Sequence, residues 1–187
     1  SLVVRSFDGV HLAVEVFQPA VSTESELLLP SVICAHPYTV MGGSAALTRG
    51  IAIRLASLGY VAVNYDMRGS GASGGSATFL NTDEVRDLEV LVGVVRSQPW
   101  RRWGTVLFGT SAGACVAGAA LEASEDIVGA FFCGYTFGWW ASILFGWTNA
   151  PLMRWEGPKH FLMGQDDGFT SPQQLQDRVA QMKGSAE

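Results

Sequence analysis

The alternation of apolar and polar residues predicts a hairpin near the amino terminus. The stretch HLAVEVFQPA alternates in this way, as a half-buried strand does, and FDGV before it supplies a turn. Residues 2–19 are therefore predicted to form a β-hairpin. From residue 31 onward, short apolar runs alternate with segments of helical spacing. The fold class predicted from this alternation is α/β, a mostly parallel doubly wound sheet flanked by helices.

The boundaries of the later elements follow from the same pattern. Strands are expected at residues 27–36, 61–66, 105–110, 127–135 and 159–164. Helices are expected at residues 45–58, 83–97, 112–124 and 172–182, the second with Thr82 as its N-cap. The glycine-rich residues 67–76 are predicted to form a loop, and the excursion between Tyr135 and Gly157 to be partly helical. No linker or repeat interrupts the pattern, so the 187 residues are interpreted as a single domain.

Composition narrows the classes of partner. Hydrophobic residues make up 48% of the chain, but no apolar run reaches the ~18 residues of a membrane span. The net charge is 12 − 17 = −5 and no basic stripe is visible, which argues against nucleic acid. The three cysteines show no metal-ligand spacing, and reduced thiols in a cytoplasmic protein are expected. No signal peptide is visible, although a chain that starts at Ser1 leaves room for a removed targeting segment.

The motif Gly109-Thr110-Ser111-Ala112-Gly113 has the form G-x-S-x-G and lies between a predicted strand and a predicted helix. This context is typical of a nucleophile elbow, in which a sharp turn exposes a serine hydroxyl above the sheet. Glycines on both sides make room for the turn, and the start of the helix favours developing negative charge. The alternative is a chance match in a chain with 22 glycines. Ser111 is the candidate nucleophile.

Two further loops carry candidate groups for acyl transfer. An oxyanion hole needs two N–H donors, and the backbone N–H of Ala112 is the first candidate. Pro37 has no N–H, so the second is assigned to Tyr38; the same loop can at the same time be a turn, with Gly42-Gly43, that leads into a helix. In the loop after residue 164, Asp166 or Asp167 is a candidate to orient an imidazole, or else both are solvated turn residues.

Four loops together resemble the α/β-hydrolase superfamily, in particular its small lidless serine hydrolases, which include uncharacterised plant-type members. The matching residues are His36-Pro37-Tyr38, Asp66-x-Arg68-Gly69-x-Gly71-x-Ser73, Gly109–Gly113 and Gly164-x-x-Asp167. The resemblance implies that Asp167 rather than Asp166 is the acid, and that His36 shapes the oxyanion loop. It also implies hydrolysis of an ester, thioester or amide in a small-molecule acyl substrate, without a cofactor or metal. Asp66 and Arg68 are expected to form an ion pair with a structural role.

The chain departs from the family order of serine, acid and histidine, because no histidine follows Asp167. His160 begins a strand and is expected ~13 Å below the catalytic edge, His11 has no assigned role, and His36 is a weak alternative base. The domain is therefore interpreted as truncated, without its last strand, histidine loop and final helix. A non-catalytic binding or scaffold protein is the alternative function.

The excursion after Tyr135 is rich in aromatic residues. These side chains are expected either to wall an apolar acyl pocket or to cover the core of the sheet. The residues concerned are Phe137, Trp139, Trp140, Phe145 and Trp147.

Overall fold

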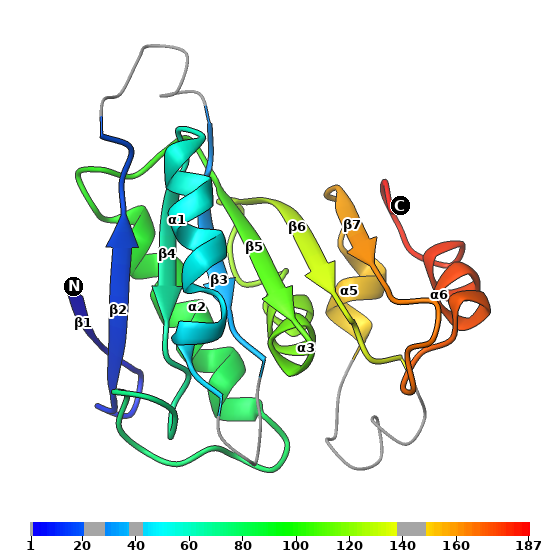
Figure 1. Ribbon diagram of the computed structural model, residues 1–187, viewed down its shortest axis with the longest axis horizontal. Coiled ribbons are helices and arrows are strands. Elements are labelled where there is room, and N and C mark those ends of the chain that lie inside the picture. The colour runs from blue at the N-terminus through cyan, green and yellow to red at the C-terminus, as the bar shows by residue number, and fades with distance from the viewer. Residues whose placement is uncertain (1, 21–28, 38–42, 138–148) are drawn as a thin grey trace.

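Seven strands form one open sheet in the computed structural model, which describes residues 2–20, 29–37, 43–137 and 149–187 (Figure 1). The strands are β1 (Leu2–Arg5), β2 (His11–Phe17), β3 (Ser31–Ala35), β4 (Val61–Tyr65), β5 (Thr105–Thr110), β6 (Ile127–Cys133) and β7 (Lys159–Leu162). They lie in the order β1-β2-β4-β3-β5-β6-β7. The hairpin β1–β2 joins β4 in antiparallel fashion, and the five strands from β4 to β7 are parallel. The predicted hairpin and the mostly parallel sheet are confirmed.

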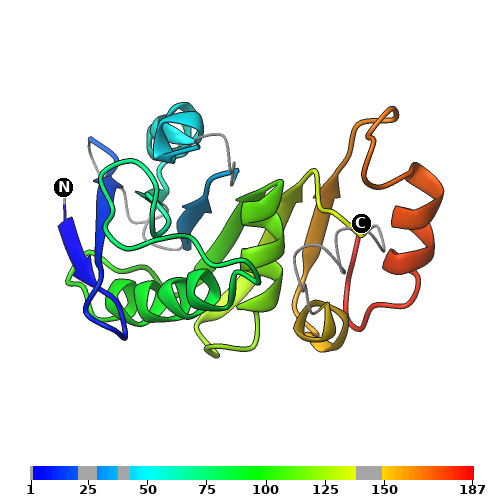
Figure 2. The ribbon, with the colours of Figure 1, turned by 90° about the horizontal axis from the view of Figure 1, so that it is seen from below.

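Helices cover both faces of this sheet. They are a 3-10 turn η2 (Ala45–Leu47), α1 (Arg49–Ser57), α2 (Thr82–Arg96), α3 (Ala112–Ala119), α5 (Ala150–Arg154) and α6 (Pro172–Val179). Figure 2 shows α1 on one face, α2, α3 and α5 on the other, and α6 beyond β7. The larger core lies under α2 and α3, where Leu88, Leu107 and Phe132 are fully buried. A smaller core under α1 includes Val32, and burial of such side chains supplies most of the folding energy.

Several predicted helix boundaries were wrong for local reasons. The helix expected at 45–58 is divided, because Thr48 donates its hydroxyl to Asn64 on β4 and closes the 3-10 turn before α1 begins. Asn81 precedes α2 with φ 50°, a left-handed conformation that asparagine tolerates, so Thr82 is the first helical residue rather than the cap. The helix expected at 112–124 ends at Ala119, and Leu121 beyond it is fully buried in the turn back to β6.

The carboxyl-terminal residues pair with β7, which the sequence pattern did not predict. The N–H of Lys159 donates to Ser185 O at 2.9 Å, and the N–H of Phe161 donates to Glu187 O at 2.7 Å. Lys159 and Ala186 form a parallel bridge. Gly184 turns the chain into this path with φ 71°, where a Cβ would lie 2.0 Å from Glu156 O. A short parallel segment therefore covers part of the outer edge of β7.

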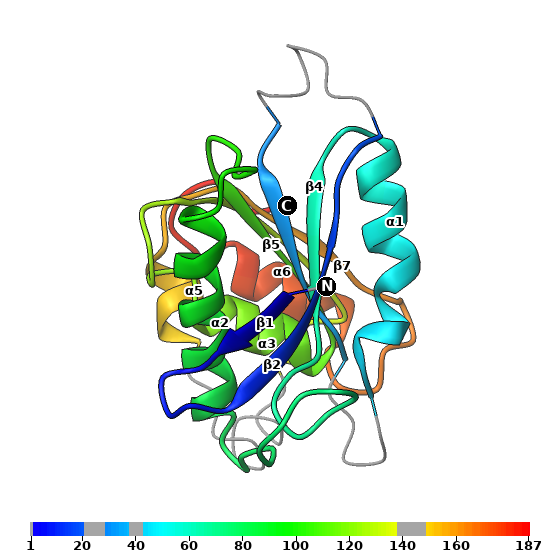
Figure 3. The ribbon, with the colours of Figure 1, turned by 90° about the vertical axis from the view of Figure 1, so that its left-hand side faces the viewer.

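The parallel strands bring their carboxyl ends to one edge of the sheet. The arrows of β4, β5, β6 and β7 point to this edge in Figure 1, and β3 is parallel to β4 and β5. Figure 3 shows the same sheet from the side of the hairpin, with α1 and α2 on opposite faces. Ligands of open α/β sheets bind outside this edge. The candidate residues His36, Asp66, Ser111 and Asp167 all follow strands that end there.

Candidate active site

Ser111 occupies the turn between β5 and α3 in an unusual backbone conformation. Its φ is 51° and its ψ is −122°, and the side chain is exposed. Among the described non-glycine residues only Asn81 shares a positive φ. Such a conformation costs about 1–3 kcal/mol and persists only where its surroundings enforce it. Here the N–H of Ser111 donates to Cys133 O at 2.8 Å, and its carbonyl accepts from Ala114 N at 2.9 Å, so both sides of the turn are fixed.

Two glycines allow the backbone around Ser111 to pack closely. A Cβ at Gly109 would lie 2.5 Å from the Cα of Ala114. A Cβ at Gly113 would lie 2.4 Å from His36 O and 2.5 Å from Ala35 O. The first turn of α3 thus rests directly on the main chain at the end of β3. Ala112 is the first residue of α3, so its N–H has no acceptor within the helix and contributes to the positive potential at the helix N-terminus.

His36 is fully buried, and both of its ring nitrogens are engaged. The N–H of Met67 lies 3.0 Å from Nε2, and Nδ1 lies 2.9 Å from Pro37 O. Because a backbone N–H only donates, Nε2 is the acceptor and Nδ1 carries the proton. Burial lowers the pKa of His36, which favours this neutral form. The imidazole therefore has no free nitrogen to accept a proton from Ser111. Tyr38, the expected second oxyanion donor, lies outside the described residues.

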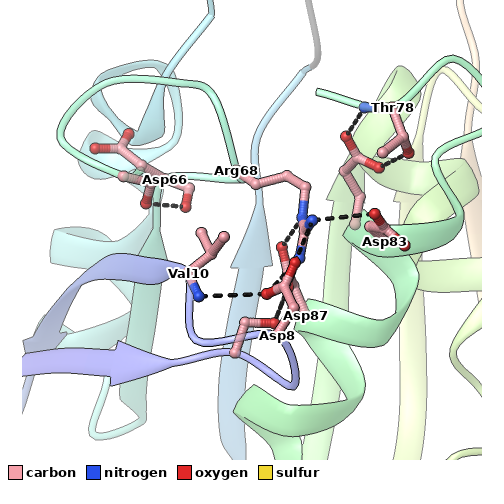
Figure 4. Close-up of polar contacts among 10 residues, drawn as sticks. Asp8, Val10, Asp66, Arg68, Thr78, Asp83 and Asp87 are labelled. Carbon is pink, nitrogen blue, oxygen red and sulfur yellow. Dashed lines mark hydrogen bonds and ion pairs between the residues drawn. The ribbon is translucent and has the colours of Figure 1, made fainter. Parts of the chain in front are cut away.

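The expected ion pair between Asp66 and Arg68 was wrong. Figure 4 shows the Asp66 carboxylate directed away from the Arg68 guanidinium. Asp66 instead accepts the backbone N–H groups of Ala45 at 2.7 Å and Ala72 at 2.8 Å. A Cβ at Gly71 would lie 2.2 Å from the carboxylate, which explains the glycine. β4 ends at Tyr65, so Asp66 and Arg68 lie in the loop that follows, where the alternation of a strand no longer sets the direction of a side chain.

Arg68 lies at the centre of a cluster of three acidic residues, Asp8, Asp83 and Asp87. Its side chain is 4% exposed, and Nη2 lies 2.7 Å from Asp87, which is fully buried. Nη1 lies 3.1 Å from both Asp8 and Asp83 (Figure 4). The hydrogen bonds that Arg68 donates to Asp87 raise the pKa of Arg68 above its already high value. The cluster ties the β1–β2 turn, the loop after β4 and the start of α2 together, which fits the expected structural role.

Asp167 is half-buried, and its carboxylate is oriented by the loop that contains it. Oδ1 accepts the N–H of Phe169 at 2.8 Å and that of Thr170 at 2.9 Å. Oδ2 accepts no hydrogen bond from the part of the chain that the structure describes. Asp166 is exposed and has no such contacts in that part. The loop therefore holds one carboxylate in a fixed orientation with a free oxygen, and leaves its neighbour in solvent.

The remaining histidines lie away from Ser111. His11 begins β2, three strands from β5 and so about 14 Å away at ~4.8 Å per strand. His160 lies on β7 with its ring 3.7 Å from the Glu187 carboxylate and stacked on Phe131. Its side chain is 52% exposed rather than directed into the edge of the sheet where Ser111 lies. In the described residues, no group of three His, Cys, Asp or Glu side chains is arranged to hold a metal ion.

The aromatic residues after Tyr135 are described only in part. Phe137 is buried, and its ring stacks on Tyr135 at 4.4 Å and lies 5.9 Å from Phe161. This favours core cover over a pocket wall for Phe137. Trp139, Trp140, Phe145 and Trp147 lie outside the described residues. No helix within the described ranges is long and apolar enough to cross a membrane.

Comparisons with known proteins agree with this fold. A model of the X-Pro dipeptidyl-peptidase (S15) family matches residues 8–183. An α/β serine hydrolase homologue from Coxiella burnetii is 22% identical with a TM-score of 0.78, covering 100% of this chain and 83% of its own. A lidless serine hydrolase from Xanthomonas campestris is 23% identical with a TM-score of 0.75, covering 100% and 81%.

A third structure with the same fold contains a bound ligand. The protein Est1E from Butyrivibrio proteoclasticus, bound to ferulic acid, is 14% identical with a TM-score of 0.80, covering 100% of this chain and 87% of its own. A search of curated proteins found no match. The solved structures share the fold of this chain, and the match to the family model extends over nearly all of it.

Proposed function

Because the chain belongs to the X-Pro dipeptidyl-peptidase (S15) family and has the α/β-hydrolase fold, we propose that it is a serine hydrolase of ester, thioester or amide carbonyls. Ser111 is the nucleophile and the reaction passes through an acyl-enzyme. The observation that carries the proposal is the strained, exposed Ser111 between β5 and α3, with glycines packed against main chain on both sides. Strain of this kind is retained at sites where it serves a reaction.

The proposed mechanism assigns a role to each group at the carboxyl edge. The Ser111 hydroxyl attacks the carbonyl carbon while a histidine accepts its proton, and the carbonyl oxygen becomes an oxyanion. The N–H groups of Ala112 and Tyr38 donate to that oxyanion. Asp167 accepts from the imidazole through Oδ2 and stabilises its cation. The histidine then protonates the leaving group, and water hydrolyses the acyl-enzyme by the same steps in reverse.

We place the base on a histidine outside residues 1–187. The three histidines of the chain lie elsewhere or have both nitrogens engaged, which supports this assignment. The path of Ser185–Glu187 also supports it, because this segment runs parallel to β7 toward the edge where Asp167 lies. At ~3.3 Å per residue, about four further residues would reach the level of Gly164.

A non-catalytic scaffold remains the second candidate, and two observations weigh against it. A binding protein gains nothing from a serine held at φ 51°, since the strain lowers stability. It also has no need to fix one oxygen of Asp167 and leave the other free.

The three free cysteines suit a reducing compartment, and we propose the cytoplasm as the location.

Labelling with a fluorophosphonate probe tests the proposal. A form of the protein that includes the downstream histidine should be labelled at Ser111 and should hydrolyse p-nitrophenyl acetate. Ser111→Ala should lose both, whereas Ser73→Ala, a serine in a neighbouring loop, should keep them. Persistent labelling of Ser111→Ala would remove the assignment. Turnover of Gly-Pro p-nitroanilide in parallel distinguishes amide from ester hydrolysis.

A further inference from the structure

Thr170 connects the loop of Asp167 to the chain that follows β6. Its side chain is fully buried. The hydroxyl donates to Tyr135 O at 3.0 Å and accepts from the N–H of Phe137 at 2.8 Å. One hydroxyl thus satisfies two backbone groups from a segment more than 30 residues away in the sequence. Buried backbone groups are costly to leave unpaired, so this hydroxyl has no simple substitute.

The segment that Thr170 contacts is itself attached to the turn of Ser111. Cys133, the last residue of β6, accepts the N–H of Ser111 at 2.8 Å. Gly134 follows and donates its N–H to Leu162 O on β7 at 2.8 Å. The next residue, Tyr135, accepts from the Thr170 hydroxyl through its carbonyl oxygen. A continuous set of hydrogen bonds therefore joins the Ser111 turn, the end of β6 and the loop after β7.

The other side of Thr170 faces Asp167. The backbone N–H of Thr170 donates to Asp167 Oδ1 at 2.9 Å, beside the N–H of Phe169 at 2.8 Å. Any displacement of Thr170 therefore moves or releases one of the two donors that orient the carboxylate. The hydroxyl of Thr170 bonds to the segment that follows β6, and its N–H bonds to Asp167. No other described residue bonds to both.

We infer that Thr170 is a positioning residue of the reaction, which sets the place of the Asp167 carboxylate relative to Ser111. This inference rests on the proposed function, because it gives Asp167 a role in turnover. Reacting groups must be held within a fraction of an ångström, and a displacement of about 1 Å can cost 10²-fold in rate. The strands before Ser111 and Asp167 are β5 and β7, which β6 separates, so Thr170 links the two loops through the segment that follows β6.

Three substitutions test the link. Thr170→Val keeps the shape but removes both hydroxyl bonds, and we expect kcat to fall about 10- to 100-fold with KM nearly unchanged. Thr170→Ser retains the hydroxyl and should stay within about 3-fold of the wild type. Thr136→Val is the matched control, since the Thr136 hydroxyl lies 3.0 Å from Cys115 Sγ and does not bond to the loop of Asp167. Equal losses in Thr170→Val and Thr136→Val would overturn the inference.

A double-mutant cycle distinguishes positioning of Asp167 from general loosening. Asp167→Asn keeps an oxygen for the two N–H donors but replaces the oxygen that would bind the imidazole. If Thr170 acts through Asp167, Thr170→Val should cost less than about 2-fold in the Asp167→Asn protein, because contacting residues couple. Losses that multiply would show that Thr170 acts by another route and would overturn the inference.

Amide hydrogen exchange gives a readout that does not depend on turnover. In Thr170→Val, the N–H groups of residues 169 and 170 should exchange faster, since their acceptor is no longer held in place. In Thr136→Val and Thr170→Ser they should exchange as in the wild type. Loss of protection in a protein without Ser111-dependent turnover would reject the proposed function but retain the anchoring by Thr170. Unchanged protection in Thr170→Val would reject the anchoring itself.

Discussion

Single residues at the edge of the sheet differ in how strongly their surroundings hold them. Asp167 accepts two backbone N–H groups through one oxygen, whereas Asp166 beside it is exposed. Adjacent carboxylates of the same type therefore have very different freedom to move. A group that must orient an imidazole needs a fixed direction, and only Asp167 has one. This difference lies in the loop geometry; the resemblance pointed to Asp167 through the spacing from Gly164, and its role as the acid stays a prediction.

Replacing each carboxylate by an amide tests this difference. In the protein with its histidine, Asp167→Asn should lower kcat by about 10³- to 10⁴-fold, because the amide nitrogen opposes the imidazole N–H. Asp166→Asn should stay within about 3-fold, since an exposed turn residue contributes little. Steady-state hydrolysis of p-nitrophenyl acetate gives both values, with Tm as a check on folding. A larger loss at Asp166 would mean that the other carboxylate is the acid.

Side-chain contacts join several helices, strands and loops at the carboxyl edge of the sheet. The sequence predicted only some of the residues that make these contacts. The order of β5, Ser111 and α3 was predictable, because an apolar run, a glycine-flanked turn and small helical residues are local signals. The partners of Arg68 were not, since Asp8, Asp83 and Asp87 come from two other elements. Links of this kind depend on which strands become neighbours. Periodicity alone does not contain that information.

His36, which follows β3, accepts a hydrogen bond from Met67 in the loop after β4. The burial of this histidine should make the stability of the fold depend on pH. Burial lowers the pKa of His36 in the folded state below its ordinary 6.5. Between the folded and unfolded values only the unfolded chain binds the proton, so the free energy of unfolding rises as the pH increases toward 6.5 and then levels off. The slope due to His36 is at most about 1.4 kcal/mol per pH unit.

Urea unfolding of the wild type and of His36→Gln, measured between pH 5 and 8, checks this dependence; the range brackets the ordinary histidine pKa of about 6.5. The glutamine can still accept the Met67 N–H but does not titrate. The difference between the two proteins should therefore shrink as the pH falls. A difference that stays constant with pH would contradict a neutral, buried His36.

The pairing of the carboxyl-terminal segment with β7 depends on a buried lysine. Lys159 is fully buried, and its ammonium donates to Trp155 O, Gly157 O and Lys183 O at 2.6, 2.9 and 2.8 Å. Lys159→Met leaves three carbonyls without a donor and should lower the free energy of unfolding by at least about 2 kcal/mol. Lys183→Met makes the same change at an exposed position and should cost less than about 0.5 kcal/mol. Chemical denaturation measures both, and equal effects would contradict the role of Lys159.

The whole molecule has one well-covered face and one partly covered face. Among the described residues α1 is the only α-helix on its side of the sheet (Figure 2), and it packs on β4. A groove of about 350 Å³ beside it is lined by apolar side chains such as Val32, Phe108 and Phe131. Leu162 on β7 is 57% exposed. The predicted fold class was correct because strand and helix patterns alternate clearly along the sequence. This alternation alone does not show how completely helices cover each face of the sheet.

We expect residues 1–187 to self-associate through this partly covered face. Contiguous apolar surface is an interaction site in water. Phe131→Lys with Leu162→Lys should shift the chain toward monomer on size-exclusion chromatography with light scattering. Val3→Lys with Leu47→Lys adds the same charge at exposed positions elsewhere and should not. A monomeric wild type, or equal solubilisation by both pairs, would contradict the prediction.

The contact of Gly113 with the end of β3 has a consequence for the genetics of the protein. The atoms that a Cβ would meet, His36 O and Ala35 O, belong to the main chain and are the same in every amino acid. A side-chain clash can be relieved by trimming the neighbour, but no substitution at residues 35 or 36 removes a carbonyl oxygen. A selection for suppressors of Gly113→Ala should therefore return true revertants rather than second-site changes in β3. Suppressors at residues 35 or 36 would show that the two main chains can separate.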